Sequence, residues 1–284
     1  MKIHKAKKSL GQNFLKSEIA LKKIVEAGEV KHGDVVLEIG PGKGALTGQL
    51  LACGCKLIAV EKDKELFEFL KIKFEKEIAE KKLILLNEDI LKFQVSNFQF
   101  PKYKIIANIP YNITGAILKK FLAAEHPSGV ALRASQPECM VLMVQHEVAK
   151  RIVASDKKES ILSISVKAYG EPKMIMKVDK RYFSPAPKVN SAIISIKNIS
   201  RKLFEKNNTS PETPSAYGAS PLAGREKFEE KFWEIVKAGF AHKRKKLSSN
   251  LKGVISPEKL SLINLKNNRA EDLTLSDWIN LAKS

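Results

Sequence analysis

A glycine-rich turn and several acidic residues stand where apolar, strand-like runs of the sequence end. The turn is Val36-Leu-Glu-Ile-Gly-Pro-Gly-Lys-Gly44, with Glu38 inside the run that precedes the glycines. Glu61 ends the next apolar run, and Asp89 closes the run after that. Glycine permits positive φ and lets a ligand approach the backbone closely. A carboxylate at the end of the second strand can accept hydrogen bonds from both hydroxyls of a ribose. Together these residues predict a site for a ribose-containing ligand.

The spacing of the glycines indicates which kind of ligand this is. Dinucleotide-binding turns have the spacing GxGxxG and hold a pyrophosphate on the following helix. Here the spacing is GxGxG, which resembles the first motif of Rossmann-like S-adenosylmethionine methyltransferases. The resemblance implies that the turn packs against the methionine and ribose of the cofactor. It also implies that Asp89 meets the adenine amino group of that cofactor.

A second motif, Asn108-Ile-Pro-Tyr111, follows the fourth apolar run. It resembles the NPPY-type motif of enzymes that methylate exocyclic amino groups. Such a nitrogen is a poor nucleophile because its lone pair is delocalised into the ring. The side-chain carbonyl of Asn108 and the backbone carbonyl of Ile109 or Pro110 can accept its two N–H groups and aim the lone pair at a methyl donor. Pro110 fixes the turn, and Tyr111 offers a ring for stacking. Alignment then supplies much of the catalysis, so no strong general base is needed.

Alternating strand and helix patterns must position these motifs. Buried strands are predicted at Val35–Ile39, Lys56–Glu61, Leu83–Leu86, Lys104–Ala107 and Met140–Gln145. Helical patterns separate them, notably Lys64–Ala79 and Thr114–Ala124. This alternation predicts an α/β domain of the Rossmann-like, doubly wound class with a mostly parallel sheet. Two later runs, Ile161–Tyr169 and Ser191–Lys197, are predicted to extend that sheet as an antiparallel edge pair.

A change of composition divides the chain. Residues 206–224 are dominated by Ser, Pro, Asn, Thr and Gly, which predicts a flexible linker. We therefore expect a catalytic, cofactor-binding domain with a basic N-terminal arm at 1–205. A small all-helical RNA-binding domain is expected at 225–284. A polar stretch at 126–138 predicts a long surface loop.

The charge balance favours a polyanionic partner. Fifty Lys and Arg against 31 Asp and Glu give a net charge of +19, and a basic excess of this kind is typical of nucleic-acid-binding proteins. One basic cluster, expected on a helix, is Lys243, Arg244, Lys245 and Lys246; a second, at the N-terminus, is Lys2, Lys5, Lys7, Lys8 and Lys16. Such clusters bind phosphates without reading sequence. We hypothesise that both flank the catalytic cleft.

Other classes of protein are disfavoured. The three cysteines form no paired CxxC units, so we expect neither a disulfide framework nor a metal site. No run is apolar enough to span a membrane, and no signal peptide is visible. We therefore expect a cytoplasmic protein without membrane partners, and a monomer.

Except for the two polar stretches at 126–138 and 206–224, nearly the whole chain resembles the ribosomal RNA adenine N6,N6-dimethyltransferase family, most closely its KsgA-like small-subunit (16S) enzymes. The segments that carry the resemblance are Ser9–Leu15, Glu38–Gly44, Asn108–Tyr111, Phe183–Val189 and Gly239–Leu247. The resemblance implies S-adenosylmethionine-dependent dimethylation of two adjacent adenosines in a hairpin near the 3′ end of the small-subunit RNA. The implied substrate is a pre-ribosomal (pre-30S) particle during ribosome biogenesis.

The resemblance also assigns roles to individual residues. The implied cofactor contacts are Asn13, Leu15, Gly40, Gly42, Glu61, Asp89 and Asn108. The implied catalytic residues are Asn108, Pro110, Tyr111 and Phe183, with the Phe183 ring stacking on the target adenine opposite Tyr111. Base–aromatic stacking contributes about 1–3 kcal/mol per base, enough to help hold an extruded adenine.

Three alternative functions stay open. One is a large-subunit ribosomal RNA adenine dimethyltransferase of the type that confers macrolide resistance. Another is a non-catalytic RNA-binding assembly factor on the same fold, although the intact glycine turn and Asn108–Tyr111 argue against it. The third is a DNA adenine methyltransferase, whose target-recognition domain is hard to find in the short helical tail.

Overall fold

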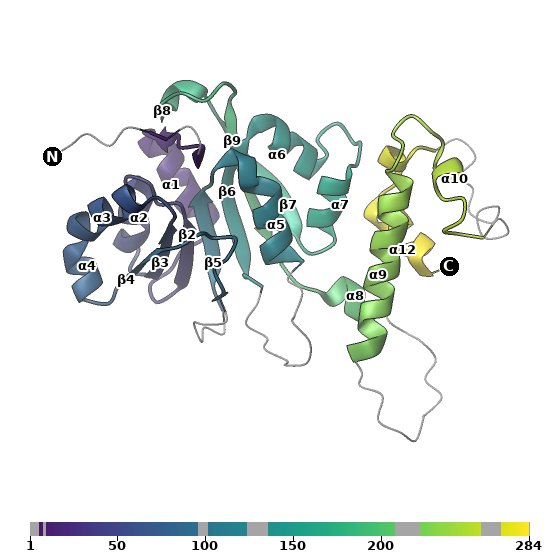
Figure 1. The fold of residues 1–284 in the computed structure, drawn as a ribbon, viewed down its shortest axis with the longest axis horizontal. Coiled ribbons are helices and arrows are strands. Elements are labelled where there is room, and N and C mark those ends of the chain that lie inside the picture. The colour runs from purple at the N-terminus through teal and green to yellow at the C-terminus, as the bar shows by residue number, and fades with distance from the viewer. Residues whose placement is uncertain are drawn as a thin grey trace, which may run out of the picture. The chain divides into compact units, whose positions relative to one another are not determined.

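The structure is a computed structural model that describes residues 6–7, 10–95, 102–123, 136–207, 222–256 and 268–283 (Figure 1). The chain forms two compact units. The first comprises Met1–Lys150 and Gly170–Ile199, and the second comprises Arg151–Tyr169 and Ser200–Ser284. The second unit thus begins before the boundary expected at 205. Most of the expected linker at 206–224 and of the expected loop at 126–138 lies outside the described residues.

The first unit is built on a seven-stranded sheet with the order β4-β3-β2-β5-β6-β9-β7. Its strands are β2 (Val35–Ile39), β3 (Lys56–Glu61), β4 (Leu83–Asn87), β5 (Lys104–Asn108), β6 (Cys139–Gln145), β7 (Glu171–Val178) and β9 (Ser191–Lys197). The first five in the sheet order are parallel, and β9 is antiparallel to both β6 and β7. The predicted Rossmann-like, mostly parallel sheet is confirmed.

Helices cover the sheet because its strands are apolar on both faces. The helices of the first unit are α1 (Glu18–Ala27), α2 (Ala45–Ala52), α3 (Lys64–Lys73), α4 (Glu75–Ala79) and α5 (Thr114–Leu122), and α6 (His146–Val153) follows β6. One core cluster joins α1 and α2 to the sheet through residues such as Ile24, Leu50, Leu57 and Ile106, and Figure 1 shows α5 on the opposite side of the sheet. Parallel strands bring their carboxyl ends to one edge, where the predicted motifs meet.

The helix predicted over Lys64–Ala79 is broken at Phe74. This residue ends α3 and precedes α4 with φ −117° and ψ 31°. Its ring packs over Gly44, where an added Cβ would lie 2.5 Å from a Phe74 ring carbon. The break therefore accommodates the packing of Phe74 against the glycine turn.

The strand predicted at Ile161–Tyr169 is wrong. Ile161–Lys167 forms helix α7 of the second unit, and the antiparallel partner of β9 is β7 instead. A capping box begins α7, since the Ser160 side chain accepts from the Ser163 backbone N–H and the Ser163 side chain accepts from the Ser160 backbone N–H. This local pairing satisfies two helix-terminal N–H groups and outweighs the strand-like alternation of apolar residues.

The second unit is helical, as expected for the C-terminal region. Besides α7 it contains α8 (Lys202–Lys206), α9 (Leu222–Gly239), α10 (Leu247–Asn250) and α12 (Leu275–Lys283). Its core is aromatic: Phe232 meets the Phe204 and Trp233 rings at centroid distances of 5.5 and 4.9 Å, and Trp278 is fully buried. Aromatic pairs at such distances give a small unit specific packing.

Candidate active site

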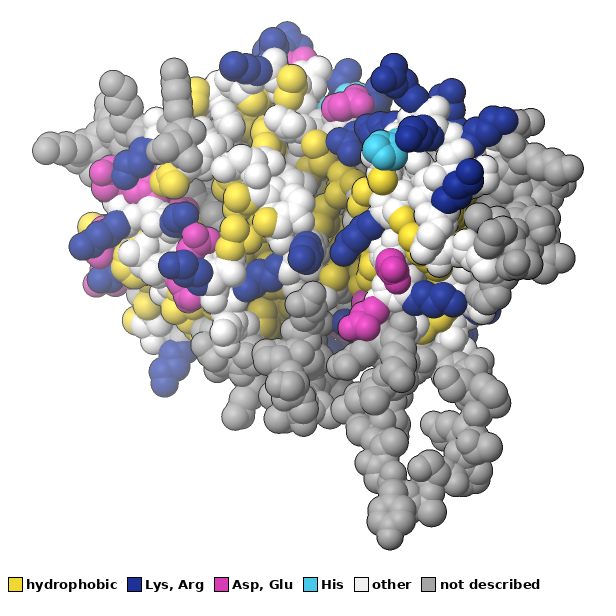
Figure 2. Space-filling model, turned by 45° about the vertical axis from the view of Figure 1, so that its right-hand side comes forward, with side chains coloured by type: hydrophobic (Ala, Val, Ile, Leu, Met, Phe, Trp, Pro, Cys, Tyr) yellow, Lys and Arg dark blue, Asp and Glu magenta, His cyan; other side chains and the backbone are white. Residues whose placement is uncertain are grey.

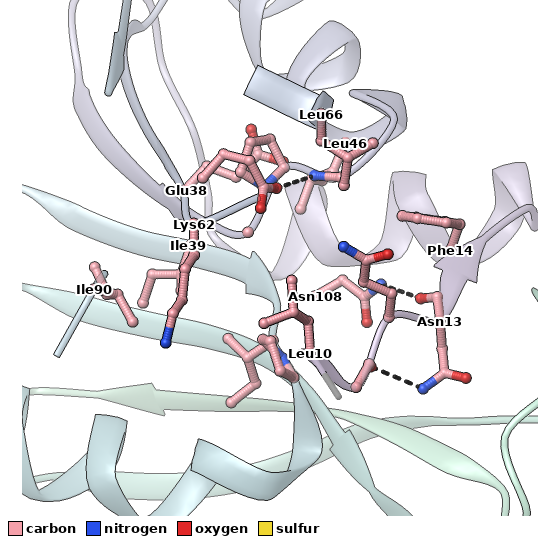
Figure 3. Close-up of a pocket in the computed structure, with 18 of the residues that line it drawn as sticks. Leu10, Asn13, Phe14, Glu38, Ile39, Leu46, Lys62, Leu66, Ile90 and Asn108 are labelled. Carbon is pink, nitrogen blue, oxygen red and sulfur yellow. Dashed lines mark hydrogen bonds between the residues drawn. The ribbon is translucent and has the colours of Figure 1, made fainter. Parts of the chain in front are cut away.

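A cavity of about 460 Å³ opens at the carboxyl ends of β2 to β5. It lies wholly within the first unit and has the size usual for small-molecule sites. Nine residues predicted for the site line it: Asn13, Leu15, Gly40, Gly42, Glu61, Asp89, Asn108, Pro110 and Tyr111. The glycine turn and the Asn108–Tyr111 motif therefore face one space, as the predicted chemistry requires. Figure 3 shows Glu38 and Ile39, which precede the turn, together with Asn108 around this cavity.

Glycine is required in the turn for two reasons. Gly40 and Gly42 have φ of +64° and +60°, in the left-handed region where a side chain is strained. A Cβ at Gly42 would also lie 3.0 Å from the Phe14 ring. The turn thus brings bare backbone to the cavity wall and leaves room for the N-terminal segment.

Glu61 is held rigidly beside this turn. One carboxylate oxygen accepts from the Gly42 backbone N–H at 3.0 Å and the other from the Asp63 backbone N–H at 2.9 Å. A carboxylate offers about four acceptor sites, so each oxygen can accept one further bond from a ligand. Burial raises the pKa of Glu61, and these two backbone N–H groups oppose that effect.

Glu38 lies deeper in the same cavity. It is 1% exposed and accepts a 2.8 Å hydrogen bond from the Thr47 hydroxyl. Burial raises its pKa to about 8. At neutral pH this side chain is therefore mainly a protonated carboxyl in the ligand-free protein, unlike an exposed glutamate.

Asp89 is the most exposed carboxylate of the predicted set. The Lys62 ammonium lies 2.8 Å from its Oδ2, and this hydrogen bond lowers the pKa of Asp89. Its other oxygen accepts from the Leu91 backbone N–H at 3.0 Å. Asp89 is thus an ionised acceptor at the rim of the cavity.

The N-terminal segment from Leu10 to Lys16 forms one wall of the cavity. Strand β1 (Phe14–Leu15) pairs antiparallel with β8 (Phe183–Ser184). Lys7 and Gln12 both contact Asp63, at 2.8 and 2.7 Å. Lys7, from the predicted N-terminal phosphate-binding cluster, is paired with Asp63 and Glu65 at the start of α3. Phosphate binding by this cluster stays a prediction.

The Asn108 side chain is oriented by its own hydrogen bond. Its Nδ2 donates to the Asn13 backbone carbonyl at 3.2 Å (Figure 3), which turns the side-chain oxygen away from that carbonyl. Nearby, the Tyr111 and Ser191 hydroxyls share a short hydrogen bond. Burial raises the pKa of Tyr111, so its hydroxyl stays protonated near neutral pH. These hydrogen bonds orient both side chains at the cavity.

Phe183 does not lie in the cavity wall. Its side chain is 2% exposed and packs in the core with Leu15, while the neighbouring Ser184 faces the cavity. The ring would have to leave this core position to stack on a base. Its predicted role in stacking therefore stays a prediction.

The helix predicted for the basic cluster Lys243–Lys246 is wrong. Helix α9 ends at Gly239, and these four exposed residues form a turn before α10. A Cβ at Gly239 would clash with the Trp278 ring, so the close packing of α12 against α9 requires a glycine at the last residue of α9.

On the face that Figure 2 shows, Lys and Arg side chains outnumber acidic ones.

Several cavity residues were not predicted from the sequence. Leu10 and Gln12 belong to the Ser9–Leu15 segment, in which only Asn13 and Leu15 are predicted cofactor contacts. Asn112, which also lines the cavity, directly follows Tyr111.

No group of three or more His, Cys, Asp or Glu suitable for a metal occurs among the residues that the structure describes. Within the same residues, none of the helices combines the length and apolarity needed to cross a bilayer.

Comparison with known proteins identifies relatives along most of the chain. Residues 3–210 match the family model "Ribosomal RNA adenine dimethylase". The chain is 38% identical to "Ribosomal RNA small subunit methyltransferase A" of Dehalococcoides mccartyi over 96% of this chain and 86% of that protein.

Two solved structures share the fold. The dimethyladenosine transferase of Plasmodium falciparum matches with a TM-score of 0.71 and 24% identity over 94% of this chain and 95% of that one. The 23S rRNA methyltransferase ErmE matches with a TM-score of 0.69 and 22% identity over 95% and 98%. Since both identities are low, these two likenesses bear on the fold alone.

Proposed function

The chain belongs to the ribosomal RNA adenine dimethylase family, and from this membership we propose how it works: it binds S-adenosylmethionine beside the glycine turn and dimethylates adenine N6 in small-subunit ribosomal RNA. The observation that carries the proposal is the single cavity lined by both Gly40–Gly42 and Asn108–Tyr111. One face of this space suits a nucleoside cofactor, and another suits an aromatic amine.

The residues around the turn fit the cofactor. Glu61 would accept hydrogen bonds from the two ribose hydroxyls through the acceptor sites left on its oxygens. Asp89, kept ionised by Lys62, would accept from the adenine amino group. The backbone of Gly40 and Gly42 would lie along the methionine and ribose portions; both residues have positive φ, and at Gly42 a Cβ would also crowd the Phe14 ring. When bound, S-adenosylmethionine supplies a methyl group on a positively charged sulfur.

The Asn108–Tyr111 motif fits the acceptor amine. The Asn108 side-chain oxygen would accept one N–H of the amine, and the backbone carbonyl of Ile109 or Pro110 would accept the other. With both protons directed at acceptors, the nitrogen lone pair points elsewhere, toward the donor. Tyr111 would stack on the base. This arrangement orients the amine without a general base, since alignment supplies much of the rate.

The relatives favour the small subunit as the substrate. The Dehalococcoides protein, at 38% identity over 96% of this chain, is named for the small ribosomal subunit. We propose two adjacent adenosines in a hairpin near the 3′ end as the target and a pre-30S particle as the substrate, in the cytoplasm, with the enzyme acting as a monomer. The exposed Lys243–Lys246 turn would contact RNA phosphates.

The test is methyl transfer to purified subunits. Unmethylated small subunits and, in parallel, large subunits are incubated with labelled cofactor, and the nucleosides are analysed. We expect N6,N6-dimethyladenosine in small-subunit RNA only. Label in large-subunit RNA would favour the macrolide-resistance type, and tight RNA binding without transfer would favour a non-catalytic factor.

An Asn108→Ala variant locates the chemistry. Because Asn108 orients the amine, we expect turnover to fall by about 100-fold or more, the usual scale for removing one oriented polar group from a transition state. Since Asn108 also lines the cofactor cavity, cofactor affinity, measured by calorimetry, should fall as well, but far less than turnover. Gln49→Ala, on α2 and outside the cavity wall, is the matched control. Full activity of Asn108→Ala would contradict the assignment.

A further inference from the structure

A second cavity, of about 360 Å³, adjoins the first. It is lined by Gly11, Asn13, Tyr111, Asn112 and Gln145, and the first four of these also line the cofactor cavity. The two spaces therefore share the walls formed by the N-terminal segment and the Tyr111 turn. Gln145 faces the second cavity and is absent from the wall of the first.

The sheet fixes the position of Gln145. It is the last residue of β6, and Met143, two residues earlier, is paired with Asn108 in the parallel register of β5 and β6. Residues two apart on a strand project to the same face, so Gln145 lies on the face of the sheet that carries Asn108. Its antiparallel partner is Ser191, whose hydroxyl binds that of Tyr111. Gln145 thus stands beside the ring predicted to stack on the substrate.

The chemistry of the two cavities differs. The cofactor cavity contains the carboxylic side chains of Glu38, Glu61 and Asp89. Among the residues that the structure describes, those lining the second cavity are three carboxamides, a phenol and a glycine, and none of them is charged. A carboxamide carries two N–H donors and a carbonyl acceptor but no charge, and carboxamides are the side chains that pair most readily with adenine. This lining suits a neutral purine better than a phosphate or an ammonium group.

We propose that Gln145 positions the target adenine: with the N6 amine at Asn108 in the first cavity, the ring extends past Tyr111 into the adjoining second cavity, where the Gln145 carboxamide donates a hydrogen bond to one of its ring nitrogens. This inference rests on the proposed function. Each methyl transfer replaces one N–H of the amine with N–CH₃, so Asn108 and its neighbouring carbonyl have fewer hydrogen bonds to accept from N6 as the reaction proceeds. A ring nitrogen keeps its lone pair through both transfers. The hydrogen bond from Gln145 therefore matters most for positioning the base during the second methyl transfer.

The test compares three substitutions in the full-length protein. Gln145→Met keeps the length of the side chain and removes its donors, whereas Gln145→Asn keeps the carboxamide on a shorter side chain. Gln49→Met, on a residue that lines neither cavity, is the matched control. Initial rates are measured on unmethylated small subunits, with N6-monomethyl- and N6,N6-dimethyladenosine separated. Affinity for S-adenosylhomocysteine is measured by calorimetry.

We expect Gln145→Met to lower kcat/KM by about 10-fold or more, the scale expected when one hydrogen bond to a base is removed, and to raise the monomethyl share of the product. Gln145→Asn should keep more activity than Gln145→Met despite its smaller volume. Both variants should bind S-adenosylhomocysteine like the wild type, which also reports that they fold.

Two results overturn the inference. In the first, Gln145→Met gives the wild-type rate and product ratio. In the second, S-adenosylhomocysteine affinity falls in parallel with activity, which would place the effect in the cofactor cavity. Failure of the wild type itself to form dimethyladenosine would instead refute the proposed function, and the inference with it.

Discussion

Glu38→Gln removes a titrating group from the inner wall of the cofactor cavity while nearly preserving its shape. Glu38 is 1% exposed, and burial raises its pKa to about 8 from an ordinary value of 4.5. The carbonyl of a glutamine can accept the same hydrogen bond from Thr47. The substitution therefore tests whether the buried carboxyl keeps its proton in the folded, ligand-free protein.

The size of the effect follows from the two pKa values. Below pH 4.5 both the folded and the unfolded chain hold the proton, so Glu38 does not make stability depend on pH. Between pH 4.5 and about 8 the unfolded chain has lost the proton and the folded chain retains it. The free energy of unfolding then falls by about 1.4 kcal/mol per pH unit. From pH 5 to pH 8 the loss amounts to about 4 kcal/mol, and glutamine has no such loss.

The assay is urea unfolding of ligand-free protein at pH 5, 6.5 and 8. Circular dichroism should follow the transition, because both tryptophans, Trp233 and Trp278, lie in the second unit. The free energy of unfolding of Glu38→Gln, relative to that of the wild type, should rise by about 4 kcal/mol from pH 5 to pH 8. Glu68→Gln, at an exposed position of α3, is the control. A difference that stays constant with pH would refute the reasoning.

Three further outcomes follow from the structure. Gly42→Ala adds a Cβ to a residue with φ of +60° and brings that atom within 3.0 Å of the Phe14 ring. We expect the free energy of unfolding to fall by about 1–2 kcal/mol and cofactor binding, measured by calorimetry, to weaken at least 10-fold. Replacing Lys243–Lys246 with Ala should flatten the salt dependence of small-subunit binding by about 0.7–0.9 in log–log slope for each phosphate that the turn no longer neutralises; an unchanged slope would exclude the turn from the interface. Ser160→Ala removes the capping box of α7 and should cost the second unit about 1 kcal/mol, measured by tryptophan fluorescence in urea; unchanged stability would show that the cap contributes little.

The sheet was predictable because its parallel strands are buried on both faces. Runs such as Val35–Ile39 and Met140–Gln145 are nearly continuous in apolar residues, and such runs bounded by turns indicate parallel strands. Ile161–Lys167 shows the limit of this reasoning. Its alternation of apolar and polar residues resembles a strand, but the Ser160–Ser163 capping box is a local helix signal that the alternation concealed.

The site residues at the ends of the parallel strands were also predictable from the sequence. The contacts that the N-terminal segment makes with distant parts of the chain were not. Gly40, Glu61, Asp89 and Asn108 each end or follow one of the parallel strands β2 to β5, whose carboxyl ends lie at the same edge of the sheet. The ion pair between Lys7 and Asp63 and the pairing of β1 with β8, which contains the buried Phe183, each join residues far apart in the chain. No local sequence pattern encodes either contact.

The pairing of β1 with β8 also has a consequence for the order of events during translation. Phe14 and Leu15 leave the ribosome early, but their partners, Phe183 and Ser184, emerge after all five parallel strands. A nascent chain that does not yet include Ser184 contains the glycine turn and the Asn108–Tyr111 motif. It lacks β8, the strand that pairs with β1 and so fixes the N-terminal segment at the cavity. We therefore expect stable capture of the cofactor to begin only when the first unit is complete, so that half-made chains do not sequester it.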